Sequence, residues 1–182
     1  MCSSDLPPPL PCVGAGAVGD GSAATPTARA ILSCQSALTK TGGKLASTRI
    51  ADTESCVTGL LACLSIQEKG GFATPADAVA CTARATGNCT RRLAALTNAT
   101  THARDAMLRA CSPLIPAELR AALGFASLQD ACGAFASNAD VVDCVIAQSS
   151  CRTDQAIALT SPRAAEVLGV AGLLSGFSCL GP

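Results

Sequence analysis

Two cysteine-bounded stretches of about thirty residues decide the fold of this chain. The first, residues 34–63, reads CQSALTKTGGKLASTRIADTESCVTGLLAC, and the second, residues 81–111, reads CTARATGNCTRRLAALTNATTHARDAMLRAC. In each stretch the cysteines and the larger apolar residues recur at intervals that return to one face of an α-helix. The sequence therefore predicts two long helices whose cysteines share a buried face.

The spacing of these cysteines indicates how the two helices pair. Cys34 and Cys56 lie about 33 Å apart along a helix, which is too far for a bond between them. If the helices pack antiparallel, however, the residue numbers of facing positions have a constant sum. That sum is 145 for Cys34 with Cys111 and for Cys56 with Cys89, and it is 144 for Cys63 with Cys81. We therefore predict a helical hairpin held by three disulfides, arranged like the rungs of a ladder.

Turn and capping residues predict where these helices begin and end. The first helix begins at Ala28, and Gly70-Gly71 is a typical C-terminal stop for it. Thr74-Pro75-Ala76-Asp77 then supplies an N-cap hydroxyl, a proline in the first turn and an acid, which together indicate a second helix start. Ser112-Pro113 ends that helix. Within the first helix, Gly42-Gly43 could bend the chain or let a neighbouring helix approach closely.

The rest of the chain predicts shorter helices. Residues 116–123 form one, a second is capped by Asn138 and runs to Leu159, and a last one starts at Ser161-Pro162 and continues to Leu174. No stretch of useful length alternates apolar and polar residues as a strand does. The predicted fold class is therefore all-α, a disulfide-laddered hairpin followed by shorter helices.

The remaining cysteines have less distinctive spacing. Cys132 and Cys144 flank a short loop, which makes a bond between them geometrically easy. Cys151 is then expected to pair with Cys179 across the last helix. This assignment leaves Cys12 free or bonded to a segment outside the chain.

Composition favours an oxidising compartment. Twelve cysteines occur in 182 residues, and there is a single histidine. Zinc, iron–sulfur and c-type haem sites all need ligand spacings that this chain lacks, so we expect disulfides and no metal or cofactor. The chain has no Trp or Tyr and four Phe, so its core is built from small aliphatic groups that crosslinks would reinforce. We expect residues 28–182 to form a single disulfide-stapled domain.

Residues 1–27 are rich in Pro, Gly and Ala and predict an extended or disordered lead. Two interpretations of its opening, MCSSDL, remain. Cys2 followed by small polar residues and prolines is typical of a mature lipoprotein, whereas residues 1–6 also match the translated end of a widely used sequencing adapter. We favour the adapter, which would mean that the true N-terminus and its signal peptide are missing. We therefore expect a secreted, periplasmic or cell-envelope protein.

Candidate catalytic groups are few. His102 is the only histidine, and Asp105 could orient it, although such pairs are also common on exposed helix faces. Each well-placed hairpin cysteine has a predicted disulfide partner, which removes it as a nucleophile. Residues 14–19 match a dinucleotide-binding pattern, but the strand and helix that the pattern needs are absent. We expect neither an enzyme nor a bound cofactor.

The second predicted helix carries a set of basic side chains. Its members are Arg84, Arg91, Arg92, Arg104 and Arg109. They could form a face for an anionic partner, but we favour a solvated face because no aromatic residues alternate with them for stacking on bases or sugars. The formal net charge of zero argues against nucleic-acid binding, and the longest apolar run, from Val167 to Leu174, is too short to span a bilayer.

Several motifs resemble those of a group of exported, Cys-rich bacterial proteins. They are the Cys34–Cys56 spacing, its repeat from Cys89 to Cys111, the ALGF turn at residues 122–125, and the DCV and DQAIAL motifs within residues 143–159. The first helix also keeps Gln35, Lys40 and Lys44 of the group's pattern but lacks its phenylalanine. The resemblance implies export and a helical fold, and it implies no activity.

Two functions are compatible with these predictions. We prefer a non-catalytic exported module, in which a rigid hairpin spaces or binds other proteins or envelope components. The alternative is a carrier of a small apolar ligand such as a lipid. Its only candidate lining is Val167–Val170 with Leu173 and Leu174.

Overall fold

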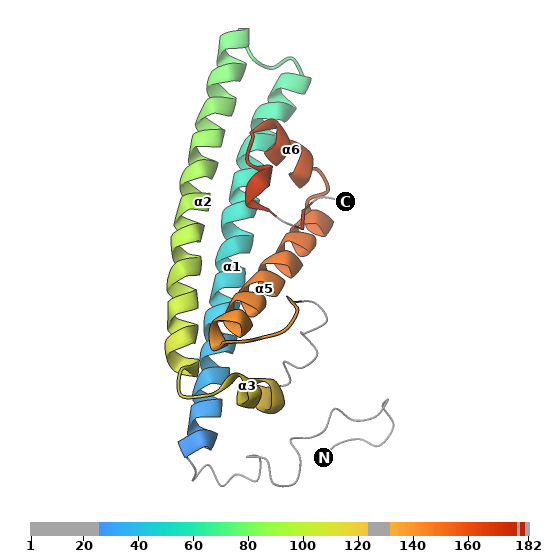
Figure 1. Cartoon of the computed structure of the whole chain (residues 1–182). Helices are drawn as coiled ribbons and strands as arrows, with labels where there is room; N and C mark the ends of the chain where they lie inside the picture. The colour runs from blue at the N-terminus through green and yellow to red at the C-terminus, as the bar shows by residue number, and fades with distance from the viewer. Residues whose placement is uncertain (1–25, 124–131, 178, 181–182) are drawn as a thin grey trace, which may run out of the picture. The chain divides into compact units, whose positions relative to one another are not determined.

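The computed structural model describes residues 26–123, 132–177 and 179–180. In this part of the chain every regular element is helical: α1 (Pro26–Glu68), α2 (Pro75–Cys111), α3 (Pro116–Leu123), α5 (Asn138–Thr160), α6 (Ala164–Val170) and the 3-10 turn η2 (Leu174–Gly176). The two long helices, α1 and α2, pack as a hairpin (Figure 1), which confirms the predicted all-α class. The MCSSDL opening and Cys12 lie outside the described residues, and Pro26 and Thr27 already belong to α1.

Three disulfides join α1 to α2, and they are the pairs that the index sums predict. Their Cα–Cα distances are 4.6 Å for Cys34–Cys111, 4.9 Å for Cys56–Cys89 and 5.8 Å for Cys63–Cys81. Two further bonds, Cys132–Cys144 and Cys151–Cys179, also follow the expected pairing. Among the cysteines of the described residues, none is free. The helices are therefore crosslinked at intervals along their length.

The end of α1 and the start of α2 follow from local hydrogen bonds. Gly70 has a φ of 64°, a left-handed conformation that glycine adopts without strain. The N–H of Gly70 donates to the Gln67 carbonyl (3.0 Å) and that of Gly71 donates to the Ile66 carbonyl (2.9 Å), which together terminate the helix. At the start of α2 the backbone N–H of Thr74 donates to Oδ2 of Asp77 (3.0 Å). This acid and the Thr74 hydroxyl form a reciprocal cap.

The start of α5 corrects one sequence prediction. Ser137, not Asn138, caps this helix: its hydroxyl accepts from the Asp140 N–H (3.2 Å), and Oδ2 of Asp140 accepts from the Ser137 N–H (2.8 Å). Asn138 is instead the first helical residue, and its amide donates to the carbonyls of Cys111 (3.0 Å) and Leu114 (2.6 Å). Serine and asparagine are similar as caps, so the sequence alone does not distinguish adjacent candidates.

The last helix is shorter than the sequence predicts. Helix α6 ends at Val170, whereas the apolar run suggests a helix through Leu174. Gly172 adopts a φ of 71°, and the N–H of Leu173 donates to the Leu168 carbonyl (2.8 Å), which ends the helix with the same type of cap as α1. Leu174 belongs to the separate turn η2.

Helix α1 continues through Gly42-Gly43. A Cβ added at Gly43 would meet no heavy atom within 4 Å, so this position is open and no neighbouring helix approaches it closely. The close-approach interpretation of Gly43 is therefore wrong.

The chain divides into two compact units, each of which takes part of both long helices. Unit 1 comprises Met1–Thr39 and Ala106–Cys144, and unit 2 comprises Lys40–Asp105 and Val145–Pro182. Unit 1 buries side chains that include Met107, Leu119 and Phe135. Unit 2 has a core cluster in which residues of α1, α5, α6 and the C-terminal segment meet. Its members include Val57, Leu60, Ile157, Val167, Leu168 and Phe177.

Candidate functional site

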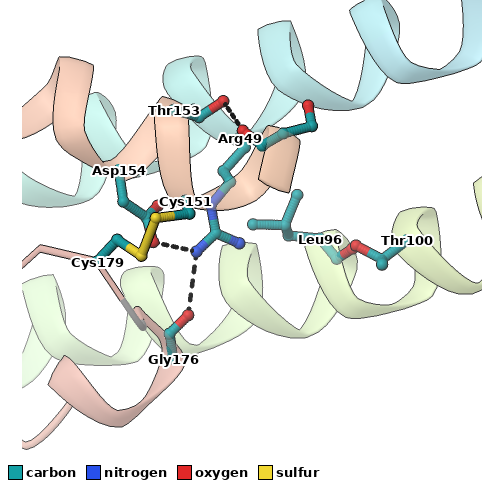
Figure 2. A network of polar contacts seen from close by, with 9 residues as sticks. Arg49, Leu96, Thr100, Cys151, Thr153, Asp154, Gly176 and Cys179 are labelled. Carbon is teal, nitrogen blue, oxygen red and sulfur yellow. Dashed lines mark hydrogen bonds and ion pairs between the residues drawn. A yellow bond between two sulfur atoms is a disulfide. The ribbon is translucent and has the colours of Figure 1, made fainter. Parts of the chain in front are cut away.

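A buried ion pair joins α1 to α5 inside unit 2. Nε of Arg49 donates to Oδ1 of Asp154 (2.7 Å), and Nη2 of Arg49 donates to Oδ2 of Asp154 (2.9 Å), as Figure 2 shows. The Asp154 side chain is 0% exposed and that of Arg49 is 11% exposed. The parallel two-bond geometry is the strongest way for an arginine to hold a carboxylate.

The same arginine fastens the C-terminal segment. Nη2 of Arg49 also donates to the Gly176 carbonyl (3.2 Å), and its Cζ lies 5.2 Å from the centre of the Phe177 ring. The Cys151–Cys179 disulfide lies beside these contacts (Figure 2). We call Arg49, Asp154, Gly176 and Phe177 the clasp. Because both Asp154 oxygens accept from Arg49, this carboxylate is committed to structure and is poorly suited to act as a base.

Sequence reasoning missed the clasp because its charged members are separated by 105 residues. One signal was available. Asp154 lies three residues before Ile157, which is buried, so it falls on the buried face of the predicted helix. A carboxylate on such a face requires a cationic partner elsewhere in the chain.

A surface groove lies at the loop end of unit 2, with a volume of about 1060 Å³. Its lining comes from the face of α2 between Pro75 and Thr90, from Leu64 of α1 and from Val170 of α6. Val79 and Val170, which both line this groove, are 70% and 69% exposed. The groove is therefore an apolar surface open to solvent.

Small side chains form most of the α2 wall of this groove. Ala78, Thr82 and Thr86 follow one another at four-residue intervals. The hydroxyl of Thr82 donates to the Ala78 carbonyl (3.1 Å), and that of Thr90 donates to the Thr86 carbonyl (3.0 Å). These hydroxyls are satisfied by their own helix, so they place no demand for hydrogen bonds on a molecule in the groove.

The groove is held by a disulfide. Cys63 and Cys81, which form the last rung of the ladder, directly precede Leu64 and Thr82, two of the lining residues. Its α1 and α2 surfaces are thus covalently joined through adjacent residues. This bond limits how far the two helices can separate at the groove.

Next to the groove, α2 forms a basic hollow of about 410 Å³ lined by Arg84, Gly87, Asn88 and Arg91. Gly87 also lines the groove, so the two surfaces are continuous. A guanidinium nitrogen of Arg91 donates to the Asn88 side-chain oxygen. Within residues 26–123, 132–177 and 179–180, no carboxylate forms an ion pair with Arg84 or Arg91.

The structure does not gather the five arginines of α2 into one face. Arg92 pairs with Asp52 of α1 (2.8 Å). Arg104 is half-buried and already interacts with another group of this chain, and Arg109 belongs to unit 1. Only Arg84 and Arg91 line a common hollow away from acidic partners among the described residues. An anionic partner would therefore meet two of these arginines, seven residues apart on one helix.

A second charged cluster lies at the start of α6. Arg163 donates to Oε1 of Glu68 (2.9 Å) and to both carboxylate oxygens of Glu166 (3.0 Å each). The hydrogen bonds from Arg163 lower the pKa of Glu166 below its usual value. These acids are already neutralised by their own chain.

His102 lines a different hollow, of about 490 Å³, together with Lys40 and Lys44. No hydrogen bond joins His102 to Asp105 in the part of the chain that the structure describes, so Asp105 does not orient the imidazole there. The described ranges also contain no cluster of three His, Cys, Asp or Glu residues that could hold a metal ion. None of their helices is both long and apolar enough to cross a membrane.

The residues expected to line a carrier cavity do not lie together on one surface. Val167 and Leu168 are buried in the core cluster of unit 2, where Leu173 packs against them. Val170 alone of this set lines the groove.

No family model matches the chain, and neither the curated proteins nor the solved structures contain a detectable relative.

Proposed function

We propose that this protein is a non-catalytic, exported interaction module of the cell envelope or extracellular space, of the Cys-rich helical type that its motifs resemble. The five disulfides among the described residues support export, because such bonds persist in oxidising compartments and are rare in the cytosol. The clasp supports a structural use of the most buried charges, because both oxygens of Asp154 are occupied by Arg49.

The groove carries the proposal of binding. Exposed Val79 and Val170 lose contact with water only if another molecule covers them, and such apolar surfaces commonly mark interaction sites. The Cys63–Cys81 bond beside the groove limits the motion of the groove. Binding of a partner would therefore cost little conformational entropy in ordering these residues.

A carrier of a small apolar ligand is the second candidate, favoured by the volume of the groove, about 1060 Å³. Ligand pockets, however, usually enclose most of the ligand, whereas the lining residues Val79 and Val170 are largely exposed. A ligand lying there would remain partly in water. We therefore prefer a protein partner.

Native mass spectrometry after mild extraction from the producing cell separates these functions. A co-purified protein in stoichiometric amount supports the module, and a co-purified lipid supports the carrier. Alkylation of intact cells before lysis tests export, because exported protein should carry no added alkyl groups on the ten disulfide cysteines of the described residues. If those cysteines are alkylated without prior reduction, export is wrong.

A further inference from the structure

We infer that the groove binds one amphipathic α-helix of a partner protein, with its apolar side in the groove and two carboxylates, about two turns apart on one flank, facing Arg84 and Arg91. This inference rests on the proposed interaction function and names the chemistry of the partner.

The dimensions of the α2 wall suit a helix. From Ala78 to Thr90 the wall covers about 18 Å, or a little more than three helical turns. Apart from Val79, its residues are alanine, threonine and glycine, so a second helix can approach closely. Val79, which falls between Thr86 and Thr90 on this face of α2, and Val170 of α6 are both exposed, so side chains spaced three and four residues apart on a partner helix can contact them.

Gly87 adds room at the rim of the groove. A Cβ built at this position meets no heavy atom within 4 Å, so no side chain of the described residues occupies the space. Glycine is unfavourable in the middle of a helix relative to alanine. A larger residue at position 87 would therefore obstruct the groove without disturbing the packing of this chain.

Charge selects an acidic partner. Successive residues of a helix rotate by about 100°, so the α2 wall turns from Thr82 and Thr86 through Gly87 to Arg84 and Arg91 on one rim. These arginines lie about 10.5 Å apart along the axis. Carboxylates seven residues apart on a partner helix have the same spacing. Glu68 and Glu166 of this chain are already paired with Arg163, so they do not supply these carboxylates.

A second copy of the chain fits less well. If two grooves met with their α2 helices antiparallel about a two-fold axis, the arginine rim of one copy would face the same rim of the other. Like charges at that distance oppose association.

The experiment uses the full oxidised chain and two labelled synthetic peptides of about 18 residues. Both peptides carry leucines along one helical face, and they differ only in having glutamates or lysines, seven residues apart, on the flank. Fluorescence anisotropy measures binding. We expect the glutamate peptide to bind at least about tenfold more tightly than the lysine peptide. The double variant Arg84→Glu/Arg91→Glu should reverse this preference.

Gly87→Leu and Gly43→Leu form a matched pair. Both replace a helix glycine that has open space around it, but only Gly87 lies in the groove. Gly87→Leu should weaken binding of the glutamate peptide about tenfold, whereas Gly43→Leu should leave it unchanged. Neither variant should lower the unfolding midpoint.

Three results would overturn the inference: equal affinity for both peptides, full binding by Gly87→Leu, or binding to phosphatidylglycerol vesicles or dodecanoate instead of either peptide. If a protein co-purifies from the producing cell while the glutamate peptide fails to bind, the interaction function stands and the acidic helix is wrong. If lipid alone co-purifies, the interaction function itself is wrong.

Discussion

Helix α5 is fastened by a neutral amide in unit 1 and by a charge pair in unit 2. In unit 1 the Asn138 amide donates to the carbonyls of Cys111, the last residue of α2, and Leu114, which follows that helix. In unit 2 the buried Asp154 carboxylate is held by Arg49. Removing the neutral amide should lower the free energy of unfolding only modestly, whereas a buried carboxylate must keep a cation beside it.

The units also differ in how the hairpin is crosslinked. Unit 1 has one rung of the ladder, Cys34–Cys111, and unit 2 has two, Cys56–Cys89 and Cys63–Cys81. The groove lies in the unit with two rungs. The part of the hairpin that carries the candidate binding surface is therefore also the part that is covalently most constrained.

The largest expected effect is the loss of the single rung in unit 1. In Cys34→Ser/Cys111→Ser the two segments of 22 residues that run back to the next rung are released, which predicts a loss of about 4 kcal/mol in the free energy of unfolding on the chain-entropy model. Hydrogen exchange should quicken in unit 1 and remain slow around Cys63–Cys81. If hydrogen exchange quickens equally in both units, the prediction that each disulfide stabilises mainly its own part of the hairpin is wrong.

Disruption of the clasp should have the second-largest effect on stability. Asp154→Ala leaves the Arg49 guanidinium without its carboxylate, and we expect a loss of about 3 kcal/mol in the free energy of unfolding. This value is at the lower end for such pairs because Arg49 keeps 11% exposure. Chemical denaturation with the disulfides intact measures it. The control Arg49→Met/Asp154→Leu should lose less than Asp154→Ala, and a larger loss would mean that the ion pair itself is strongly stabilising.

A smaller loss is expected for the neutral fastening of unit 1. Asn138→Ala removes two hydrogen bonds, to the carbonyls of Cys111 and Leu114, and should lower the free energy of unfolding by about 1–2 kcal/mol. The same denaturation experiment provides the comparison with Asp154→Ala. If Asn138→Ala is the more damaging variant, our contrast between neutral and charged fastenings is wrong.

The smallest effect concerns the cap of α5. Hydrogen bonds from the backbone N–H groups of Ser137 and Ala136 lower the pKa of Asp140 below its usual value. Because the folded-state pKa is depressed, the stabilisation is present above the unfolded-state pKa and is lost as the pH falls through the folded-state pKa. An NMR titration should find Asp140 ionised below the range of exposed aspartates. In Asp140→Asn the fraying of α5 should no longer depend on acid pH.

Local patterns were sufficient to predict the helices and most of their ends. Gly70, Thr74 and Asp77 act within a few residues of one another, so their roles can be read from neighbouring positions. The error at Ser137 and Asn138 arose where two adjacent residues can both cap a helix. Asn138 was needed for a hydrogen bond to Cys111, 27 residues earlier, which no local rule includes.

The groove was only partly predictable for the same reason. The small residues at Ala78, Thr82 and Thr86 are visible in the sequence, but Leu64 and Val170 reach the same surface from two other helices. The apolar run after Val167 suggested a ligand cavity, yet Val167 and Leu168 fill the core, and only Val170 faces the groove. The hydrophobicity of a short apolar run does not predict which of its residues other helices will bury.

The sequence by itself determined that this protein is a helical hairpin with a ladder of disulfides, because helical periodicity and a constant index sum are properties of residue numbers alone. Tertiary structure alone decided that Asp154 meets Arg49, that Arg84 and Arg91 lie beside an apolar groove, and that Val170 remains exposed. These contacts depend on how separate helices pack against one another. Burial and charge pairing at such distances have no periodic signature along the chain.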